Sequence, residues 1–155
     1  MERISIMERR KFLGLGLVAA TLIPASLSAV DFRKEKPDAF TAHNVADAIK
    51  ALYGDIKFEE KGDLTVKVPK IASNGGAIPV SIQSGLELKS IALFQDANPE
   101  SAVAVFTIGE GMIVNYMTKI KMKGPGEVTL VAEGKDGKFY KTSKKLDVAL
   151  GGCEG

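Results

Sequence analysis

From residue 64 onward, apolar and polar side chains alternate with a period of two, and turn residues interrupt the alternation every eight to twelve positions. A period of two places successive side chains on opposite faces of a strand, so each run predicts a β-strand with one buried face. We expect seven or eight short strands, over 64–68, 78–83, 88–94, 102–108, 113–122, 128–133 and a last strand that turns Leu146, Val148 and Leu150 inward.

Two of these segments carry a more specific expectation. The run 102–108 is apolar on both faces, which indicates a buried central strand, although part of it could instead lie at a subunit interface. Asp136 and Gly137 stand between two strand patterns, and this pair favours a two-residue hairpin turn.

Helical periodicity is convincing only over residues 39–53, where apolar side chains form one stripe. Asp38 can cap this helix and Gly54 can end it, while the charged stretch 31–37 reads as loose. Together the patterns predict a mainly β fold, an immunoglobulin-like antiparallel β-sandwich with one N-terminal helix. The Cys-Trp-Cys core of antibody domains is absent, because the chain has one cysteine and no tryptophan.

The N-terminus has the pattern of a twin-arginine signal peptide over residues 1–29. Arg9 and Arg10 precede an uncharged apolar run from 14 to 23, which is too short to span a membrane, and the small residues of 24–29 follow it. Cleavage after Ala29 and after Ser28 are both compatible with this pattern, and Met1 and Met7 are both candidate starts. A short membrane anchor is disfavoured because no stop-transfer pattern follows. We therefore expect export to the periplasm, one sandwich domain over 30–150 that includes the helix 39–53, and a terminal arm over 151–155.

Export changes the charge of the chain. The full sequence has 21 basic and 19 acidic side chains, but residues 30–155 hold 17 of each, so the mature part has no net charge. The excess of basic over acidic side chains is therefore a property of the precursor. Nothing in the mature part indicates binding to nucleic acid or to an acidic membrane.

The single cysteine, Cys153, lies in the tail formed by residues 151–155, between Gly152 and Glu154. Gly151, Gly152 and Gly155 give this tail few steric limits, so the thiol is expected on a flexible arm that reaches ~15 Å beyond the last ordered residue. In an oxidising compartment, a lone cysteine cannot form an internal disulfide. It pairs with another molecule or stays reactive.

No other residues form a catalytic or metal-binding set. The one histidine, His43, reads as a surface or half-buried helix residue, and Met112, Met117 and Met122 read as ordinary core and surface methionines. We expect no cofactor and no metal. Lys119, Lys121 and Lys123 share one face of a strand, either as a solvated sheet face or as a docking patch for an acidic partner or for sulfur anions.

Taken in order along the chain, the motifs resemble the SoxY family, the sulfur-carrier subunit of the periplasmic thiosulfate-oxidising system. The resemblance rests on the twin-arginine signal and on the segments 51–55, 69–75, 78–80, 93–99, 136–140 and 151–153. It implies a non-catalytic carrier that holds thiosulfate-derived sulfur covalently on Cys153. It also implies a heterodimer with a SoxZ-type subunit, and service to a SoxAX-type cytochrome, a SoxB-type hydrolase and, in some systems, a SoxCD-type dehydrogenase.

The chain departs from the family at Glu154, because the usual ending is Gly-Gly-Cys-Gly-Gly. A carboxylate beside the thiol disfavours the thiolate and repels sulfur oxyanions, although an exposed tail screens both effects. The alternative hypothesis is an exported interaction module in which Cys153 forms an intermolecular disulfide with another subunit. The glycines favour the carrier, because a structural crosslink usually gains from rigidity.

Overall fold

The structure, a computed structural model, describes residues 30–59 and 62–149. In this part of the chain, three short helices precede nine strands. They are α2 (Phe32–Glu35), α3 (Pro37–Thr41), α4 (Val45–Tyr53), β1 (Phe58–Glu59), β2 (Leu64–Lys67), β3 (Ile71–Ala72), β4 (Ile78–Ser84), β5 (Leu88–Gln95), β6 (Ala102–Thr107), β7 (Val114–Ile120), β8 (Gly126–Gly134) and β9 (Phe139–Val148). No helix of the described ranges is long and apolar enough to cross a membrane.

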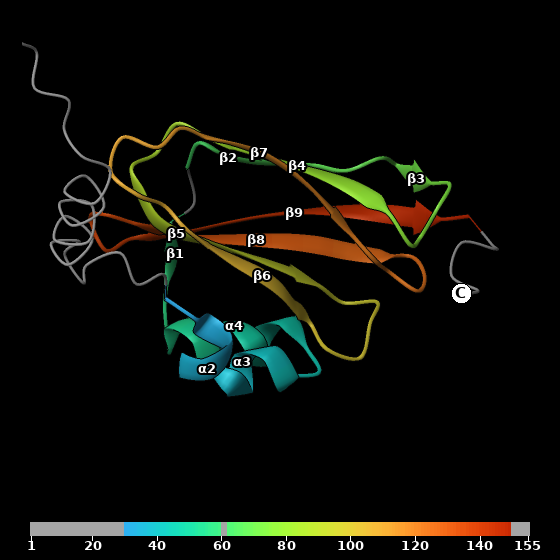
Figure 1. The fold of residues 1–155 in the computed structure, drawn as a ribbon, viewed down its shortest axis with the longest axis horizontal. Coiled ribbons are helices and arrows are strands. Elements are labelled where there is room, and N and C mark those ends of the chain that lie inside the picture. Colours follow the sequence, from blue (N-terminus) through green and yellow to red (C-terminus); the bar gives the residue numbers. More distant parts are fainter. Residues whose placement is uncertain (1–29, 60–61, 150–155) are drawn as a thin grey trace, which may run out of the picture.

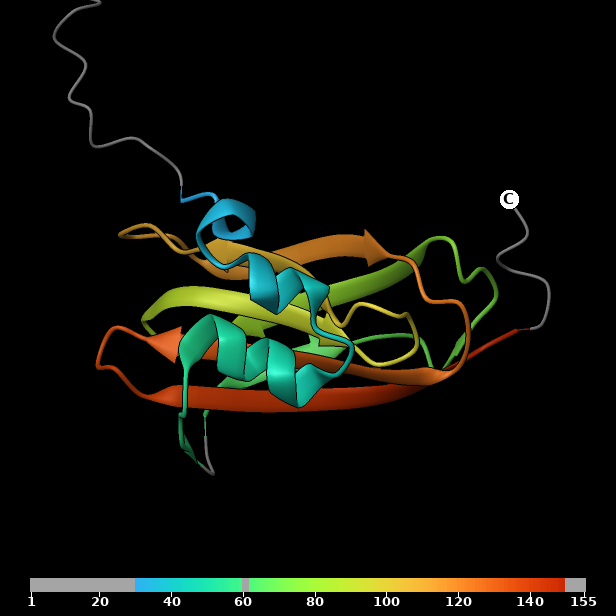
Figure 2. The same ribbon diagram turned by 90° about the horizontal axis from the view of Figure 1, so that it is seen from below.

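The strands form two sheets that face each other, and the helices cover the outer face of the larger one (Figures 1 and 2). The larger sheet has the order β1-β9-β8-β5-β6, with β3 also paired to β9, and the smaller sheet has the order β2-β4-β7. The predicted β-sandwich is confirmed. It is not purely antiparallel, because the two-residue strands β1 and β3 both run parallel to β9.

Alternation along the strands builds the core between the sheets. The smaller sheet contributes Val66, Val80 and Ile82, while Leu93 and Leu130 face them from the larger sheet, and all five are at most 1% exposed. Full burial of one such side chain stabilises the fold by about 1.5–3 kcal/mol, so this layer is the main source of stability. The strands predicted from the period of two all appear, with small shifts at their ends.

The prediction of one helix over 39–53 was wrong, because two helices occupy this region. Ala42 is extended (φ −67°, ψ 135°), and its carbonyl oxygen accepts a hydrogen bond of 3.0 Å from the backbone N–H of Ser101. Asn44 then starts α4, where its side chain accepts a 2.8 Å hydrogen bond from the backbone N–H of Asp47. The stretch expected to be loose contains α2, and Asp38 lies inside α3 rather than at its N-cap.

The strand over 102–108 was predicted to be central, but β6 lies at the edge of the larger sheet. Both of its faces are nevertheless partly covered. Ala102 and Val105 pack under the helices, while Val103 and Phe106 pack against the core between the sheets. A three-layer arrangement therefore produces an apolar edge strand, and the central strands are β5 and β8.

The hairpin between β8 and β9 is longer than the predicted two-residue turn. Gly137 donates its N–H to the carbonyl oxygen of Gly134 at 3.0 Å, and Gly134 donates its own to Lys138 at 2.8 Å. Gly137 has φ +79°, which is the left-handed conformation that follows a type I turn in a three-residue hairpin. The glycine was correctly identified as the turn residue, but the turn type was not.

Candidate functional site

The predicted site residues Cys153, Gly151, Gly152 and Gly155 lie outside the described residues. The structure does describe the strand that leads to them as far as Ala149. The sandwich therefore determines where the terminal segment begins.

The end of β9 is held from both sides. On one side, β8 pairs with it in an antiparallel register that runs from Gly126 opposite Leu146 to Glu133 opposite Phe139. On the other side, the N–H of Asp147 donates to the carbonyl oxygen of Lys70 at 2.9 Å, and the N–H of Ala149 donates to that of Ala72 at 2.8 Å. Leu146 is buried in the core. The origin of the terminal segment is thus fixed to the sheet up to the last described residue.

The loops at this end of the sandwich are also fastened to each other. Asn98 joins two of them, because its side chain donates to the carbonyl oxygen of Lys121 at 2.7 Å and accepts from the N–H of Lys123 at 3.0 Å. Gln95 is fully buried, and its side-chain oxygen accepts hydrogen bonds from the N–H groups of Ala97 and Asn98. These bonds hold a defined surface around the end of β9.

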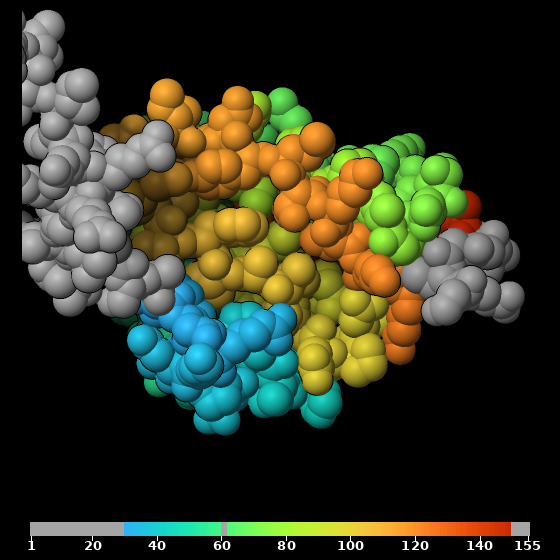
Figure 3. Space-filling view, in the orientation of Figure 1, coloured from blue at the N-terminus to red at the C-terminus, as the bar shows by residue number. Residues whose placement is uncertain are grey.

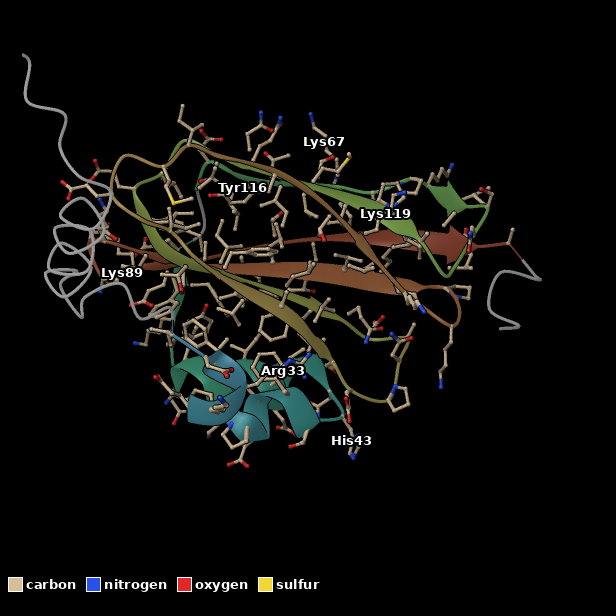
Figure 4. All side chains as sticks on the ribbon, viewed as in Figure 1. Arg33, His43, Lys67, Lys89, Tyr116 and Lys119 are labelled. Atoms are coloured by element: carbon tan, nitrogen blue, oxygen red, sulfur yellow. The ribbon has the colours of Figure 1, made fainter. Side chains whose placement is uncertain are left out.

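The three lysines predicted to share one face do so. Lys119, Lys121 and Lys123 are exposed, while the intervening Ile120 and Met122 are buried. Two further exposed lysines that the sequence did not reveal lie on the same side of the molecule, Lys67 in β2 and Lys70 just before β3. Figure 4 shows Lys67 and Lys119 together on the side of the smaller sheet, away from the helices. Only the β2-β4-β7 pairing reveals this neighbourhood, although the alternation of Thr65 and Lys67 was a usable signal.

The other candidate residues behave as surface and core residues. His43 is exposed but lies between α3 and α4 rather than within a helix, and its Nδ1 is 2.9 Å from the carbonyl oxygen of Pro99, which joins the helical layer to a loop of the sheet. Met117 is 73% exposed, whereas Met122 is fully buried, in agreement with their interpretation as surface and core methionines. Within residues 30–59 and 62–149, no group of three or more His, Cys, Asp or Glu side chains could hold a metal ion.

A polar cluster that the sequence did not reveal lies at the opposite end of the sandwich. The hydroxyl of Tyr53 is 3.1 Å from Oγ of Ser90, which in turn donates to Glu133 at 3.4 Å, and Lys89 pairs with Glu133 at 3.2 Å. The pKa of Tyr53 is raised to about 12, mainly because the phenol is buried; the hydrogen bond with Ser90 lowers this pKa and the charge of Glu133 raises it. The Tyr53 ring also packs edge-on against Phe139 at 5.2 Å, so this cluster fastens α4 to the sheet.

Comparison with known proteins gives one family and one fold. The family model described as sulfur oxidation protein SoxY matches residues 49–153. The structure of the sulfur carrier protein SoxY from Chlorobium limicola f thiosulfatophilum is similar with a TM-score of 0.61 and 26% identity, covering 68% of this chain and 96% of that one. No curated protein matched the sequence.

A second group of similar structures shares only the fold. Superoxide reductase (neelaredoxin) from Ignicoccus hospitalis has a TM-score of 0.50 and 11% identity, covering 56% of this chain and 80% of that one. A putative superoxide reductase from Thermotoga maritima has a TM-score of 0.50 and 16% identity, covering 61% and 94%. At such identities, the likeness concerns the sandwich and carries no activity with it.

Proposed function

Because the chain belongs to the SoxY family of sulfur oxidation proteins, we propose that it is a non-catalytic sulfur carrier of the periplasm. Cys153 holds sulfur intermediates derived from thiosulfate and presents them to oxidising and hydrolysing partner enzymes. One observation carries this proposal: the family match runs to residue 153 and so includes Gly151, Gly152 and Cys153. A structure of similar fold is itself that of a sulfur carrier protein.

The chemistry needs only a thiol from this chain. The Cys153 thiol and thiosulfate form an S–S bond, which gives a cysteine S-thiosulfonate, one proton and two electrons, and a SoxAX-type cytochrome accepts the electrons. Water then attacks the sulfonate sulfur in the active site of a SoxB-type hydrolase, which releases sulfate and leaves a persulfide on Cys153. A SoxCD-type dehydrogenase would accept six electrons from this sulfane sulfur as three waters supply its oxygens, and hydrolysis of the resulting cysteine S-sulfonate would release a second sulfate and restore the thiol. Thiol exchange chemistry of this kind depends on access to the sulfur and on its thiolate fraction.

The anchored origin and the glycines have complementary roles in this proposal. The hydrogen bonds from Asp147 and Ala149 to the segment around β3 fix where the arm begins. Gly151 and Gly152 would then let Cys153 enter successive active sites without moving the sandwich. The covalent S–S bond retains a small anion that would otherwise diffuse away between the steps.

The proposal includes a cellular setting. The signal pattern of residues 1–29 would direct export by the twin-arginine pathway. A SoxZ-type subunit would form a heterodimer with the exported sandwich. Neither a nucleic acid nor a membrane takes part in the function of the mature chain.

Intact mass of the mature protein tests the function directly. Protein from thiosulfate-grown cells is measured before and after a reductant, with Cys153→Ser alongside. Reductant-sensitive sulfur or sulfur-oxyanion increments that depend on Cys153 are the expected result. A thiol that never acquires sulfur, or a stable disulfide to one fixed subunit, would instead favour an exported interaction module.

A further inference from the structure

Five exposed lysines occupy one side of the sandwich, on and beside the outer face of the smaller sheet. We call this surface the basic face, and its lysines are Lys67, Lys70, Lys119, Lys121 and Lys123. In Figure 3, the orange atoms of the β7 region lie on the side of the molecule opposite the blue and cyan helices, which locates this face. The helices thus cover one side of the sandwich and leave the other side open.

The basic face contains no carboxylate of its own. Residues 64–84 and 111–126, which supply its strands and loops, include no Asp or Glu. The rest of residues 30–155 holds twelve basic and seventeen acidic side chains, so a mature chain with no net charge is strongly polarised. None of the ion pairs found among the described residues involves these five lysines. Their positive charge is therefore presented to solvent without internal compensation.

The strand register places apolar contact surface among these charges. One row of paired residues crosses β2, β4 and β7 and consists of Lys67, Ser81 and Met117. In a neighbouring row, Pro79 lies opposite Lys119. Met117 and Pro79 are both exposed. Exposed apolar side chains surrounded by charges are typical of protein–protein interfaces, which combine an apolar centre with a polar rim.

The lysines are spread too widely to serve one small anion. Lys67 and Met117 are separated by two strand spacings, about 10 Å, and Lys119 lies beyond Met117 along β7. A sulfur oxyanion can be enclosed only by groups that converge on it. An extended acidic surface, in contrast, can contact all five ammonium groups at once.

The basic face adjoins the origin of the terminal arm. Lys70 belongs to it and accepts the hydrogen bond from the N–H of Asp147 through its carbonyl oxygen. Lys121 and Lys123 belong to the loop between β7 and β8, which Asn98 binds through their backbone at the same end of the sandwich. A protein docked on this face would therefore lie beside Ala149, the residue after which the C-terminal segment follows.

We propose that the basic face is the docking surface for an acidic rim on the enzymes that load and unload Cys153. This inference rests on the proposed carrier function and adds to it the surface used and the charge of the partner. Complementary charge mainly raises the association rate and orients the encounter, which suits a carrier that must release one enzyme before it meets the next.

The test compares two triple charge reversals in the heterodimer with the SoxZ-type subunit. Lys119→Glu/Lys121→Glu/Lys123→Glu alters the basic face. Lys57→Glu/Lys135→Glu/Lys138→Glu makes the same change in net charge at exposed positions outside this face. The readout is the second-order rate constant for thiosulfate loading of Cys153 by the SoxAX-type cytochrome of the same organism. We expect the rate constant of the first variant to be roughly tenfold below that of wild type at about 20 mM salt, and this difference to vanish near about 500 mM. The rate constant of the second variant should stay within about twofold of wild type at both salt concentrations.

Several results would overturn the proposal. Equal rate constants for the two variants at low salt would do so, and so would loss of the heterodimer in the first variant, which would make this face a permanent subunit interface. A third result would assign the face to a membrane instead. In that case the wild type and the second variant bind phosphatidylglycerol vesicles, the first variant does not, and the loading rate constants are unchanged.

Docking can also be measured without the sulfur chemistry. Binding of the Cys153→Ser heterodimer to the immobilised cytochrome should weaken with salt and with the first triple change alone. If wild-type Cys153 is never loaded but this binding pattern is found, the carrier function fails while the docking surface stands. If Cys153 is loaded but this binding pattern is absent, the docking surface fails while the carrier function stands.

Discussion

The backbone N–H of Ala149 donates a hydrogen bond to the carbonyl oxygen of Ala72 at a distance of 2.8 Å. This bond links the last described residue before the C-terminal segment to β3, a strand of two residues that pairs with no other strand than β9 in the described sheet. The small strand β3 thus serves to hold the end of β9, and its role can be tested at Ala149.

Ala149→Pro should loosen the end of β9, because proline has no N–H to donate to Ala72. The loss of one backbone hydrogen bond lowers the free energy of local opening by about 1 kcal/mol. Amide hydrogen exchange at Asp147 should therefore accelerate about fivefold, while the global stability changes little. Hydrogen exchange measured by NMR checks this expectation. Ala149→Gly keeps the N–H and serves as the control. Unchanged exchange at Asp147 in the proline variant would show that Ala149 does not hold the strand end.

Gly151→Pro/Gly152→Pro should separate access to the thiol from delivery of the thiol. Proline fixes φ near −65°, so the arm loses conformations needed to enter partner active sites. Labelling of Cys153 by iodoacetamide should stay at the wild-type rate, while loading by the SoxAX-type cytochrome should fall at least about tenfold. Gly151→Ala/Gly152→Ala is the matched control, and its loading rate should lie between those of wild type and the proline variant. Wild-type loading in the proline variant would mean that the arm does not need to bend.

Tyr53→Phe should change how stability depends on alkaline pH. The pKa of Tyr53 is raised from 10.0 to about 12 in the folded protein, so below pH 10 the phenol is protonated in both states and its contribution to stability is complete. Between pH 10 and 12, only the unfolded chain ionises, and stability falls by at most about 3 kcal/mol.

Urea unfolding of wild type and Tyr53→Phe at several pH values measures this effect as the difference between their free energies of unfolding. The titration of the lysines is the same in both proteins and cancels in this difference. Near pH 8 the phenylalanine variant should be less stable by about 1 kcal/mol, since the hydrogen bond with Ser90 is lost. Above pH 10 this difference in stability should narrow and then change sign, because the wild type alone loses up to about 3 kcal/mol. A gap that is constant with pH would contradict the assignment of the raised pKa to Tyr53.

Tyr116→Phe should behave differently, although the chemical change is the same. The hydroxyl of Tyr116 is buried and has no hydrogen-bond partner among the described residues, and its ring stacks on Phe106 at 6.0 Å. Removal of an unsatisfied buried hydroxyl should leave stability unchanged or raise it by up to about 1 kcal/mol. Thermal unfolding of the isolated chain checks this. A marked destabilisation would show that the hydroxyl has a partner after all.

The sequence predicted the sandwich well because strand periodicity reports burial directly. Val66, Val80 and Ile82 occupy alternate positions, and all three are buried. It failed where the third layer matters. The two apolar faces of β6 indicated a central strand, but the helices above Ala102 and Val105 cover one face of an edge strand. Nothing in the local pattern distinguishes burial under a helix from burial between two strands.

The candidate site was predictable only in part, for a related reason. The shared face of Lys119, Lys121 and Lys123 was predicted from their spacing and is confirmed, whereas Cys153 lies outside the described residues and stays a prediction. Lys67 joins that face only through strand pairing across about fifty residues, which no spacing rule encodes, and Lys70 follows three residues after it. The Tyr53–Ser90–Glu133 cluster is likewise assembled from three distant elements.

The two-sided fastening of β9 also has a mechanical meaning. If the chain is the proposed carrier, a partner enzyme that holds Cys153 would pull on the C-terminal end of this strand. Hydrogen bonds to β8 and to the β3 segment stand across the axis of the strand, so the pull would load them together in shear rather than opening them one at a time. In the proposed carrier, this arrangement would let the terminus be inserted and withdrawn repeatedly while the rest of the fold stays undisturbed.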